Sequence, residues 1–337
     1  MRKKRWWLGV TALVGMLALS GCGKQFDVGE SDSAALAEDN RIVVGVSQIG
    51  SESVWRTANT NSIQRAFTQE NGYLMIFNNA RQKQENQIKA IRSFISQQVD
   101  YIVFSPITEN GWDTVLQEAQ DSGIPIILMD RQLKTADESL YTAWVGSNFE
   151  QEGVLAGNWL DGYLKEKGRE EEPVRIVVLQ GTAGATSVIG RTEGFHSVAR
   201  EHANWEILEE TDAEYTTAKG HEVMEKMLFS YDTIDVVVSQ NDDMTFGAVE
   251  AIKNAGKTTG TEGDIIIISF DACRAALEMV QNGVINVDIE CNPEQGEAIA
   301  KVIEALERGE TVDKKCYIEE KVFTPDNVGE YIESRSY

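Results

Sequence analysis

The chain has 337 residues, with 31 Lys and Arg against 54 Asp and Glu, and a formal net charge of −23 at pH 7. A balance this acidic argues against binding to the phosphates of nucleic acids and against a basic patch for an anionic membrane surface. The length exceeds one ordinary hydrophobic core and favours two domains.

The first 40 residues predict export and a lipid anchor. Basic residues at 2–5 precede an uncharged, mostly apolar run over 6–19, which has the length of a signal-peptide core rather than of a membrane span. The tetrapeptide LSGC that ends at Cys22 resembles the lipobox of bacterial lipoproteins. We therefore expect 1–21 to be a signal peptide, Cys22 to carry the lipid and the acidic segment 22–40 to be a tether. The alternative is an ordinary signal peptide with an incidental cysteine.

From residue 41 onward, short β-branched runs alternate with amphipathic stretches. The runs 126–128 and 265–268 are apolar on both faces, as strands of a helix-covered parallel sheet must be. Ile88, Ile91 and Ile95 recur at helical spacing. The alternation predicts an α/β fold with two doubly wound parallel-sheet lobes. The expected strands are 41–47, 74–78, 101–105, 125–130 and 143–146, then 175–180, 206–211, 236–240 and 265–271.

The break between the two sets of strands falls near Gly146-Ser147-Asn148, without a long linker rich in Pro, Gly or Ser. Short strands that cross between the lobes as a hinge would explain this. Three cysteines follow Cys22, and an odd number at wide spacing is neither a disulfide framework nor a metal site. We expect buried small apolar side chains, although one pair could form a disulfide. These cysteines are Cys273, Cys291 and Cys316.

Polar residues follow the predicted strands at their carboxyl ends, where ligands bind in open α/β sheets. Two such rims that face each other would form a cleft. The stretches concerned are 50–56, 82–86 and 130–131 in the first lobe, and 181–184 with Arg191, 241–243 and Asp271 in the second.

These residue types suit an uncharged polyol. Carboxylates, amides and guanidinium groups can bind adjacent hydroxyls in pairs, and Trp55 could supply an apolar plane for a sugar ring. Each also has a structural interpretation. Asp130-Arg131 could be a surface ion pair, Trp55 could be core, and Asn241 and Asp242 could cap the following helix. The glycines of 181–184 could form a plain turn.

The chain resembles the type I periplasmic sugar-binding proteins, the ribose- and galactose-binding family, over about residues 41–310. Val54, Ala272-Cys273 and 184–186 depart from the family pattern; glycine is expected after Asp271. The stretches that carry the resemblance are 46–48, 50–53, 55–56, 82–90, 123–125 leading to 130–131, 179–182 and 241–244.

The resemblance implies a fold with two lobes joined by a three-strand hinge, with crossovers near Ser147, Ala272 and Glu290. The N-terminal lobe would then comprise 41–147 plus 272–290, and the C-terminal lobe 148–271 plus 291–337. The implied sugar contacts are Glu52, Ser53, Trp55, Arg56, Asp130, Arg131, Arg191, Asn241 and Asp271.

The function implied is capture of a monosaccharide by hinge closure and its delivery to the permease of an ABC importer. The protein would be a monomer anchored outside the cytoplasm, with no cofactor, metal or nucleic acid. Galactofuranose is the first expected sugar, followed by galactose, ribose, fructose and arabinose. The same sequence is compatible with a sensor that presents sugar to a membrane receptor or kinase.

Two other classes are disfavoured. Asp130 and Asp271 could be the carboxylates of a glycosidase, but both suit hydroxyl binding, and no Ser-His-Asp elbow is present. His221-Glu222 lacks the second histidine of a zinc motif. A repressor of the lactose-repressor type shares the implied fold but needs a helix-turn-helix where this chain has an export signal.

Overall fold

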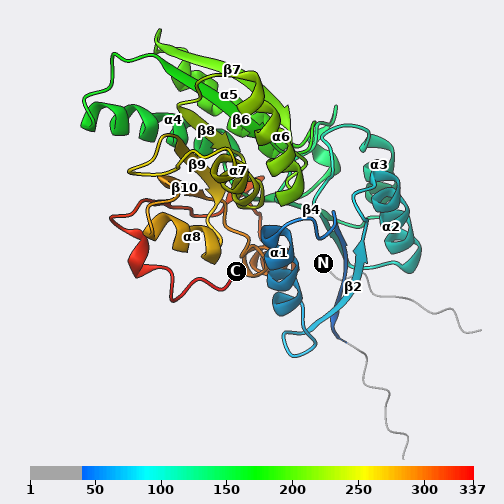
Figure 1. Cartoon of the computed structure of the whole chain (residues 1–337). Helices are drawn as coiled ribbons and strands as arrows, with labels where there is room; N and C mark the ends of the chain where they lie inside the picture. The colour runs from blue at the N-terminus through cyan, green and yellow to red at the C-terminus, as the bar shows by residue number, and fades with distance from the viewer. Residues whose placement is uncertain (1–39) are drawn as a thin grey trace, which may run out of the picture.

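The computed structural model describes residues 40–337, which form two α/β lobes (Figure 1). The predicted signal peptide, Cys22 and nearly all of the predicted tether lie outside the described residues. Within 40–337, no helix combines the length and apolar character needed to cross a membrane.

The N-terminal lobe is built on a parallel sheet in the strand order β11-β5-β4-β3-β1-β2. Alternate residues of β4 explain the layers, because Ile126 and Leu128 pack under α2 and α3 while Ile127 and Met129 pack under α1 and α9. The elements are β1 (Ile42–Gln48), α1 (Val54–Ala66), β2 (Tyr73–Asn79), α2 (Gln84–Gln97), β3 (Tyr101–Phe104), α3 (Asp113–Asp121), β4 (Ile126–Met129), β5 (Ala143–Gly146), α9 (Gly296–Glu307) and β11 (Lys315–Tyr317).

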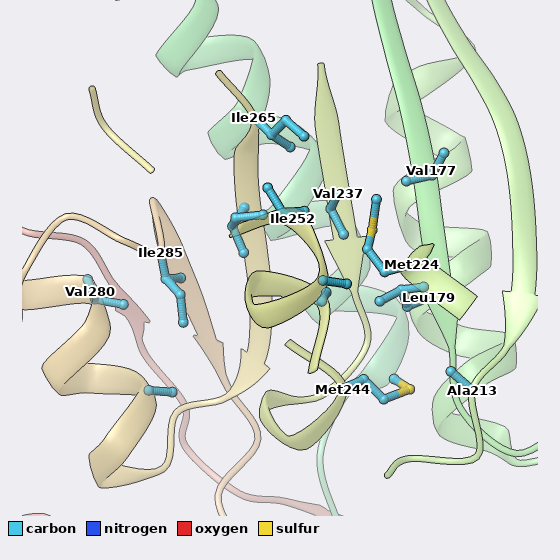
Figure 2. Close-up of a cluster of buried hydrophobic side chains, with 14 of the residues drawn as sticks. Val177, Leu179, Ala213, Met224, Val237, Met244, Ile252, Ile265, Val280 and Ile285 are labelled. Carbon is cyan, nitrogen blue, oxygen red and sulfur yellow. The ribbon is translucent and has the colours of Figure 1, made fainter. Parts of the chain in front are cut away.

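The C-terminal lobe has the sheet order β12-β10-β9-β8-β6-β7, in which β12 is antiparallel. Figure 2 shows the core on one face, where Val177 and Val237 pack against Met224 of α6 and Ile252 of α7. Helices α4 and α5 cover the other face. The elements are α4 (Phe149–Glu166), β6 (Val174–Gln180), α5 (Thr186–Ala199), β7 (Trp205–Asp212), α6 (Thr217–Ser230), β8 (Val236–Ser239), α7 (Asp242–Asn254), β9 (Ile266–Asp271), α8 (Arg274–Gln281), β10 (Val287–Glu290) and β12 (Val322–Phe323).

The nine predicted strands are all present, with ends within one residue of those expected. Three short strands, β10, β11 and β12, were not predicted. The three described cysteines after Cys22 are free thiols. Cys273 and Cys291 are buried, as expected, whereas Cys316 is only partly buried.

The chain crosses between the lobes at three places: at Ser147, over 291–295, and over 318–321. The crossovers expected near Ser147 and Glu290 are therefore present, but the one expected near Ala272 is wrong. Strand β10 pairs in parallel with β9, which keeps residues 272–290 in the C-terminal lobe.

The predicted division of the later chain is wrong for the same reason. Helix α9 packs its apolar face against the N-terminal sheet, and β11 pairs with β5, so residues 296–317 belong to the N-terminal lobe. Only the part of 291–337 from β12 onward joins the C-terminal sheet.

Candidate ligand-binding site

A cavity of about 30 Å³ lies between the carboxyl ends of the strands of the two lobes. All nine predicted contact residues line it. They are Glu52, Ser53, Trp55, Arg56, Asp130 and Arg131 from the N-terminal lobe, and Arg191, Asn241 and Asp271 from the C-terminal lobe.

Arg56 is the centre of the N-terminal half of the site. Its Nη2 lies 2.7 Å from Asp130 Oδ2, and its Nε lies 3.1 Å from Glu52 Oε1. Burial on its own would lower the pKa of Arg56, but the charges of Asp130 and Glu52 outweigh it and raise that pKa above its usual value. The guanidinium is therefore a permanent cation that faces two carboxylates.

The first turn of α1 positions this group. Ser53 caps the helix, because its side chain accepts a hydrogen bond of 3.1 Å from the Arg56 backbone N–H. Trp55 is buried, and its Nε1 donates to the Cys291 carbonyl of the second crossover. Its ring packs with Phe149 and also lines the cavity, so Trp55 is both a core residue and an apolar wall of the site.

Two carboxylates of the site sit in strained backbone positions. Asp130 directly follows β4 with φ 59°, and Asp271 ends β9 with φ 105°. Non-glycine residues rarely adopt such angles, and they cluster at ligand-binding sites. Ser105 Oγ donates to Asp130 Oδ2 at 3.0 Å and helps to fix that carboxylate.

Arg131 forms no ion pair with a carboxylate of the part of the chain that the structure describes. Its Nη1 donates to the Ile107 carbonyl at 2.9 Å, and its guanidinium lies 5.5 Å from the centre of the Tyr215 ring. Burial and the nearby Arg56 lower its pKa. A surface Asp130-Arg131 ion pair is thus excluded, because both residues are buried and Asp130 pairs with Arg56.

Arg191, on α5, is the centre of the C-terminal half. Its Nε donates to Glu152 Oε2 at 2.6 Å, its Nη2 lies 3.4 Å from Asp271 Oδ1, and its Nη1 donates to the Gln240 carbonyl. Burial raises the pKa of Asp271 well above its usual value, and Arg191 offsets only part of that effect.

Asn241 caps the following helix, as one interpretation of the sequence expected, and it also lies at the cavity. Its Oδ1 accepts from the Met244 N–H at 2.9 Å and caps α7, while its side chain also lines the cavity. The neighbouring Asp242 is structural. It accepts hydrogen bonds from Ser269 Oγ at 2.6 Å and from the Cys273 N–H at 2.7 Å.

Four cavity residues were not predicted: Phe149, Ser187, Tyr215 and Cys291. The Tyr215 hydroxyl lies 2.8 Å from Ser187 Oγ. Gly181 makes room for the tyrosine, since a Cβ there would come within 1.9 Å of the ring. The glycines after β6 could have predicted that a bulky side chain packs against this turn, but they could not have identified that side chain as Tyr215.

The stretch 82–86 supports the site without lining the cavity. The Gln84 side chain accepts from Thr108 Oγ1, and the adjoining Gln87 receives the Ile107 N–H and donates to the Ser105 carbonyl. These contacts fix the loop whose Ile107 carbonyl receives Arg131.

The two lobes are closed on each other. The Val54 N–H of α1 donates to Asp243 Oδ2 of α7 at 3.2 Å, and the Gln132 N–H donates to Thr186 Oγ1 of α5 at 2.9 Å. The cavity wall carries three carboxylates, those of Glu52, Asp130 and Asp271, and three guanidinium groups. This balance favours a ligand without net charge.

Two doubly wound lobes with a shared cleft and three crossovers define a type I periplasmic binding protein. Residues 43–311 match the family model of the periplasmic binding protein domain, and the chain belongs to this family. Its members bind solutes rather than convert them, and membership implies a location outside the cytoplasm.

Three similar proteins are named by the sugars they bind. The galactofuranose-binding protein YtfQ of Escherichia coli K12 is 36% identical over 87% of this chain and 91% of its own. A structure from Mycobacterium smegmatis in complex with β-D-fucofuranose is 40% identical, with a TM-score of 0.83 over 88% of this chain and 95% of that one. The binding component of the arabinose ABC transporter of Shewanella sp. ANA-3, bound to L-arabinofuranose, is 38% identical, with a TM-score of 0.81 over 87% and 95%.

Proposed function

We propose that this protein captures a monosaccharide in the furanose form, with galactofuranose as the first candidate, and delivers it to an ABC importer. The observation that carries the proposal is the cavity between the lobes. Two rims of charged and amide side chains, one from each lobe, meet there with balanced charge and with aromatic walls.

The chemistry of the cavity fits a sugar. Hydroxyl groups donate to Glu52, Asp130 and Asp271 and accept from the three guanidinium groups, through charge-assisted hydrogen bonds. Trp55 and Phe149 offer apolar surface to the C–H groups of a ring. A buried charged group left without its hydroxyl partner costs about 1–3 kcal/mol or more, so such a site discriminates between hydroxyl patterns.

Binding requires the lobes to open and close. A volume of about 30 Å³ is far below that of a monosaccharide and accommodates little more than one or two water molecules. We infer that the three crossovers act as a hinge and that sugar, by bonding to both lobes, favours a closed state that surrounds it. A dissociation constant in the micromolar range corresponds to a binding free energy of about 8 kcal/mol, which the bonds to both lobes must supply together.

Furanose ligands are favoured because the three relatives described above are named for galactofuranose, fucofuranose and arabinofuranose. A thermal-shift screen over aldoses and ketoses, with ring forms controlled, tests this. Sugars that are present largely in the furanose ring form should raise the melting temperature of the protein most. Asp130→Ala and Arg131→Ala should each abolish the shift in a protein that still folds, and unchanged affinity in both variants would refute the assigned site.

We propose that the protein acts as a monomer, anchored to the cell membrane through lipidated Cys22 after removal of 1–21. Cys22→Ser should move it from the membrane fraction to the soluble fraction. Deletion of its gene should abolish uptake of the sugar. Normal uptake with a lost transcriptional response would instead assign the protein to sensing.

A further inference from the structure

The three crossovers bring side chains to one point, where Ser147 and Cys291 are buried and Glu320 is partly buried. Ser147 comes from the first, Cys291 from the second and Glu320 from the third. A carboxylate oxygen of Glu152, the sulfur of Cys291 and a carboxylate oxygen of Glu320 all lie within 4.8 Å of one another. We call these four residues, Ser147, Glu152, Cys291 and Glu320, the hinge cluster.

Hydrogen bonds connect the crossovers within this cluster. Ser147 Oγ donates to Glu320 Oε1 and lies 3.3 Å from Cys291 Sγ. The Asn292 N–H, also from the second crossover, donates to the same Glu320 oxygen at 3.0 Å. Glu320 is therefore the residue through which all three crossovers are held together in the closed protein.

The hinge cluster contains more carboxyl groups than cations can balance. Glu152 is 1% exposed. Its Oε2 binds Arg191, and its Oε1 has no hydrogen-bond partner among residues 40–337. Arg191 is also in contact with Asp271. Glu152 and Glu320 thus face each other beside one guanidinium that a third carboxylate shares.

A proton on one of the two glutamates resolves this imbalance. Burial raises the pKa of Glu152, and it raises the pKa of Glu320 to about 9, with the charge of Glu152 as the next cause. The other titratable groups that face the pair are Arg191 of α5, Asp271 at the end of β9 and the Cys291 thiol, whose pKa burial also raises.

The two glutamates of the cluster reach the sugar site through Arg191, and Cys291 lines the cavity itself. Glu152 Oε2 receives the Arg191 Nε–H at 2.6 Å, and Arg191 lines the cavity. Because Glu152 belongs to α4 and Glu320 to the third crossover, a change in hinge angle alters how the two groups meet.

We infer that Glu152 is a positioning residue that holds Arg191 in place for the sugar, and that Glu320 fixes Glu152 by sharing one proton with it across the closed hinge. The inference rests on the proposed sugar site, since Arg191 must contact the sugar for affinity to change. It makes the C-terminal half of the site dependent on hinge closure.

The test compares Glu320→Ala with Glu320→Gln by calorimetry, using the furanose sugar identified in the screen. At pH 7, Glu320→Ala should weaken binding by about tenfold or more, because Glu152 loses its proton-sharing partner. Glu320→Gln should stay within about threefold of the wild type, since its amide N–H replaces the shared proton. Glu319→Gln, an exposed neighbour, is the matched control and should leave affinity unchanged.

A double variant separates positioning from a merely structural role. If Glu320 acts through Arg191, the loss caused by Glu320→Ala should shrink to less than about threefold in an Arg191→Lys background. An undiminished loss in that background, or equal losses for the Ala and Gln variants, would overturn the inference.

A further readout needs no sugar and distinguishes this inference from the proposed function. A carboxyl group whose pKa is raised by folding contributes stability that is present at low pH and lost as the pH rises towards the folded-state value, here about 9. The melting temperature of the wild type should therefore fall relative to Glu320→Gln between about pH 5 and pH 9. A difference that does not change with pH would refute the shared proton, even if no sugar bound.

Discussion

The two halves of the site hold their central arginines in different ways. In the N-terminal lobe, Arg56 is fixed by Glu52 and Asp130, which themselves line the cavity. In the C-terminal lobe, Arg191 is fixed chiefly by Glu152, which lies behind the cavity and beside the crossovers. Both carboxylates that fix Arg56 line the cavity, whereas the one that chiefly fixes Arg191 is in contact with the hinge.

This difference indicates a division of roles. Because Arg56, Glu52 and Asp130 all belong to the N-terminal lobe, we expect this rim to keep its geometry when the cleft opens and to make the first contact with a ligand. We expect the C-terminal rim to reach its final arrangement only as the hinge closes, because Glu152 meets Glu320 of the third crossover. Affinity then reports two separable contributions, and the variants below test them.

The largest effect is expected for Arg56→Ala. It leaves Glu52 and Asp130 buried without their cation, and breaking a buried pair costs about 3–5 kcal/mol. Both the free energy of unfolding and sugar binding should fall sharply in denaturation and calorimetry experiments.

Arg65→Ala on the same helix is the matched control. Its side chain is 59% exposed, against 4% for Arg56, and loss of its pair with Glu294 should cost less than about 1 kcal/mol. Similar costs for the two variants would contradict a buried N-terminal network.

An intermediate effect is expected at the contact that bridges the closed lobes. Burial raises the pKa of Asp243 to about 6, although the Val54 N–H partly offsets this. In the open form this carboxyl group is expected to be solvated, so closure favours its protonated state. Sugar affinity of the wild type should therefore decrease as the pH rises to about 6 and then level off.

Asp243→Asn removes the free-energy cost of burying a charged carboxylate on closure, while its amide oxygen can still accept the hydrogen bond from the Val54 N–H. The variant should bind sugar up to roughly tenfold more tightly at pH 8, with the advantage disappearing near pH 4. Titration calorimetry between pH 4 and pH 8 measures the sugar affinity of the wild type and of the variant. An advantage of equal size at every pH would show that Asp243 does not titrate on closure.

The smallest effect is expected at Ala272, which has φ 60° and is fully buried after Asp271. A left-handed alanine costs about 1–2 kcal/mol, so Ala272→Gly should stabilise the protein by about 1 kcal/mol after the added flexibility of the unfolded chain. In helix α8 nearby, Ala276→Gly should destabilise by about 1 kcal/mol instead. Opposite signs in urea denaturation would confirm the strain, and destabilisation by both would argue against it.

The sequence was sufficient to predict those site residues whose position is determined by the end of a strand. Asp130 and Asp271 follow long apolar runs whose parallel pairing is readable, so their place at the rim was predictable. Phe149 and Tyr215 reach the cavity through tertiary packing and carry no motif. The family's glycine after Asp271 corresponds to the left-handed φ found at Ala272.

The crossover near Ala272 came from the resemblance alone, and the local sequence did not reveal that 272–290 stays in the C-terminal lobe. Residues 287–290 alternate apolar and acidic side chains, which is typical of a strand with one solvated face. Both acids are in fact buried. Asp288 accepts from the Ala272 N–H, and Glu290 pairs with Arg335. These compensating partners lie 16 and 45 residues away, so no local pattern reveals them.

The most direct measurement is a calorimetric titration of residues 40–337 with monosaccharides of defined ring form. One saturable site for a furanose, weakened strongly both by Asp130→Ala and by Arg191→Ala, is the expected result, because the ligand must bond to both lobes. Heat with a peptide or a metal ion but with no monosaccharide would contradict the assignment of the cleft.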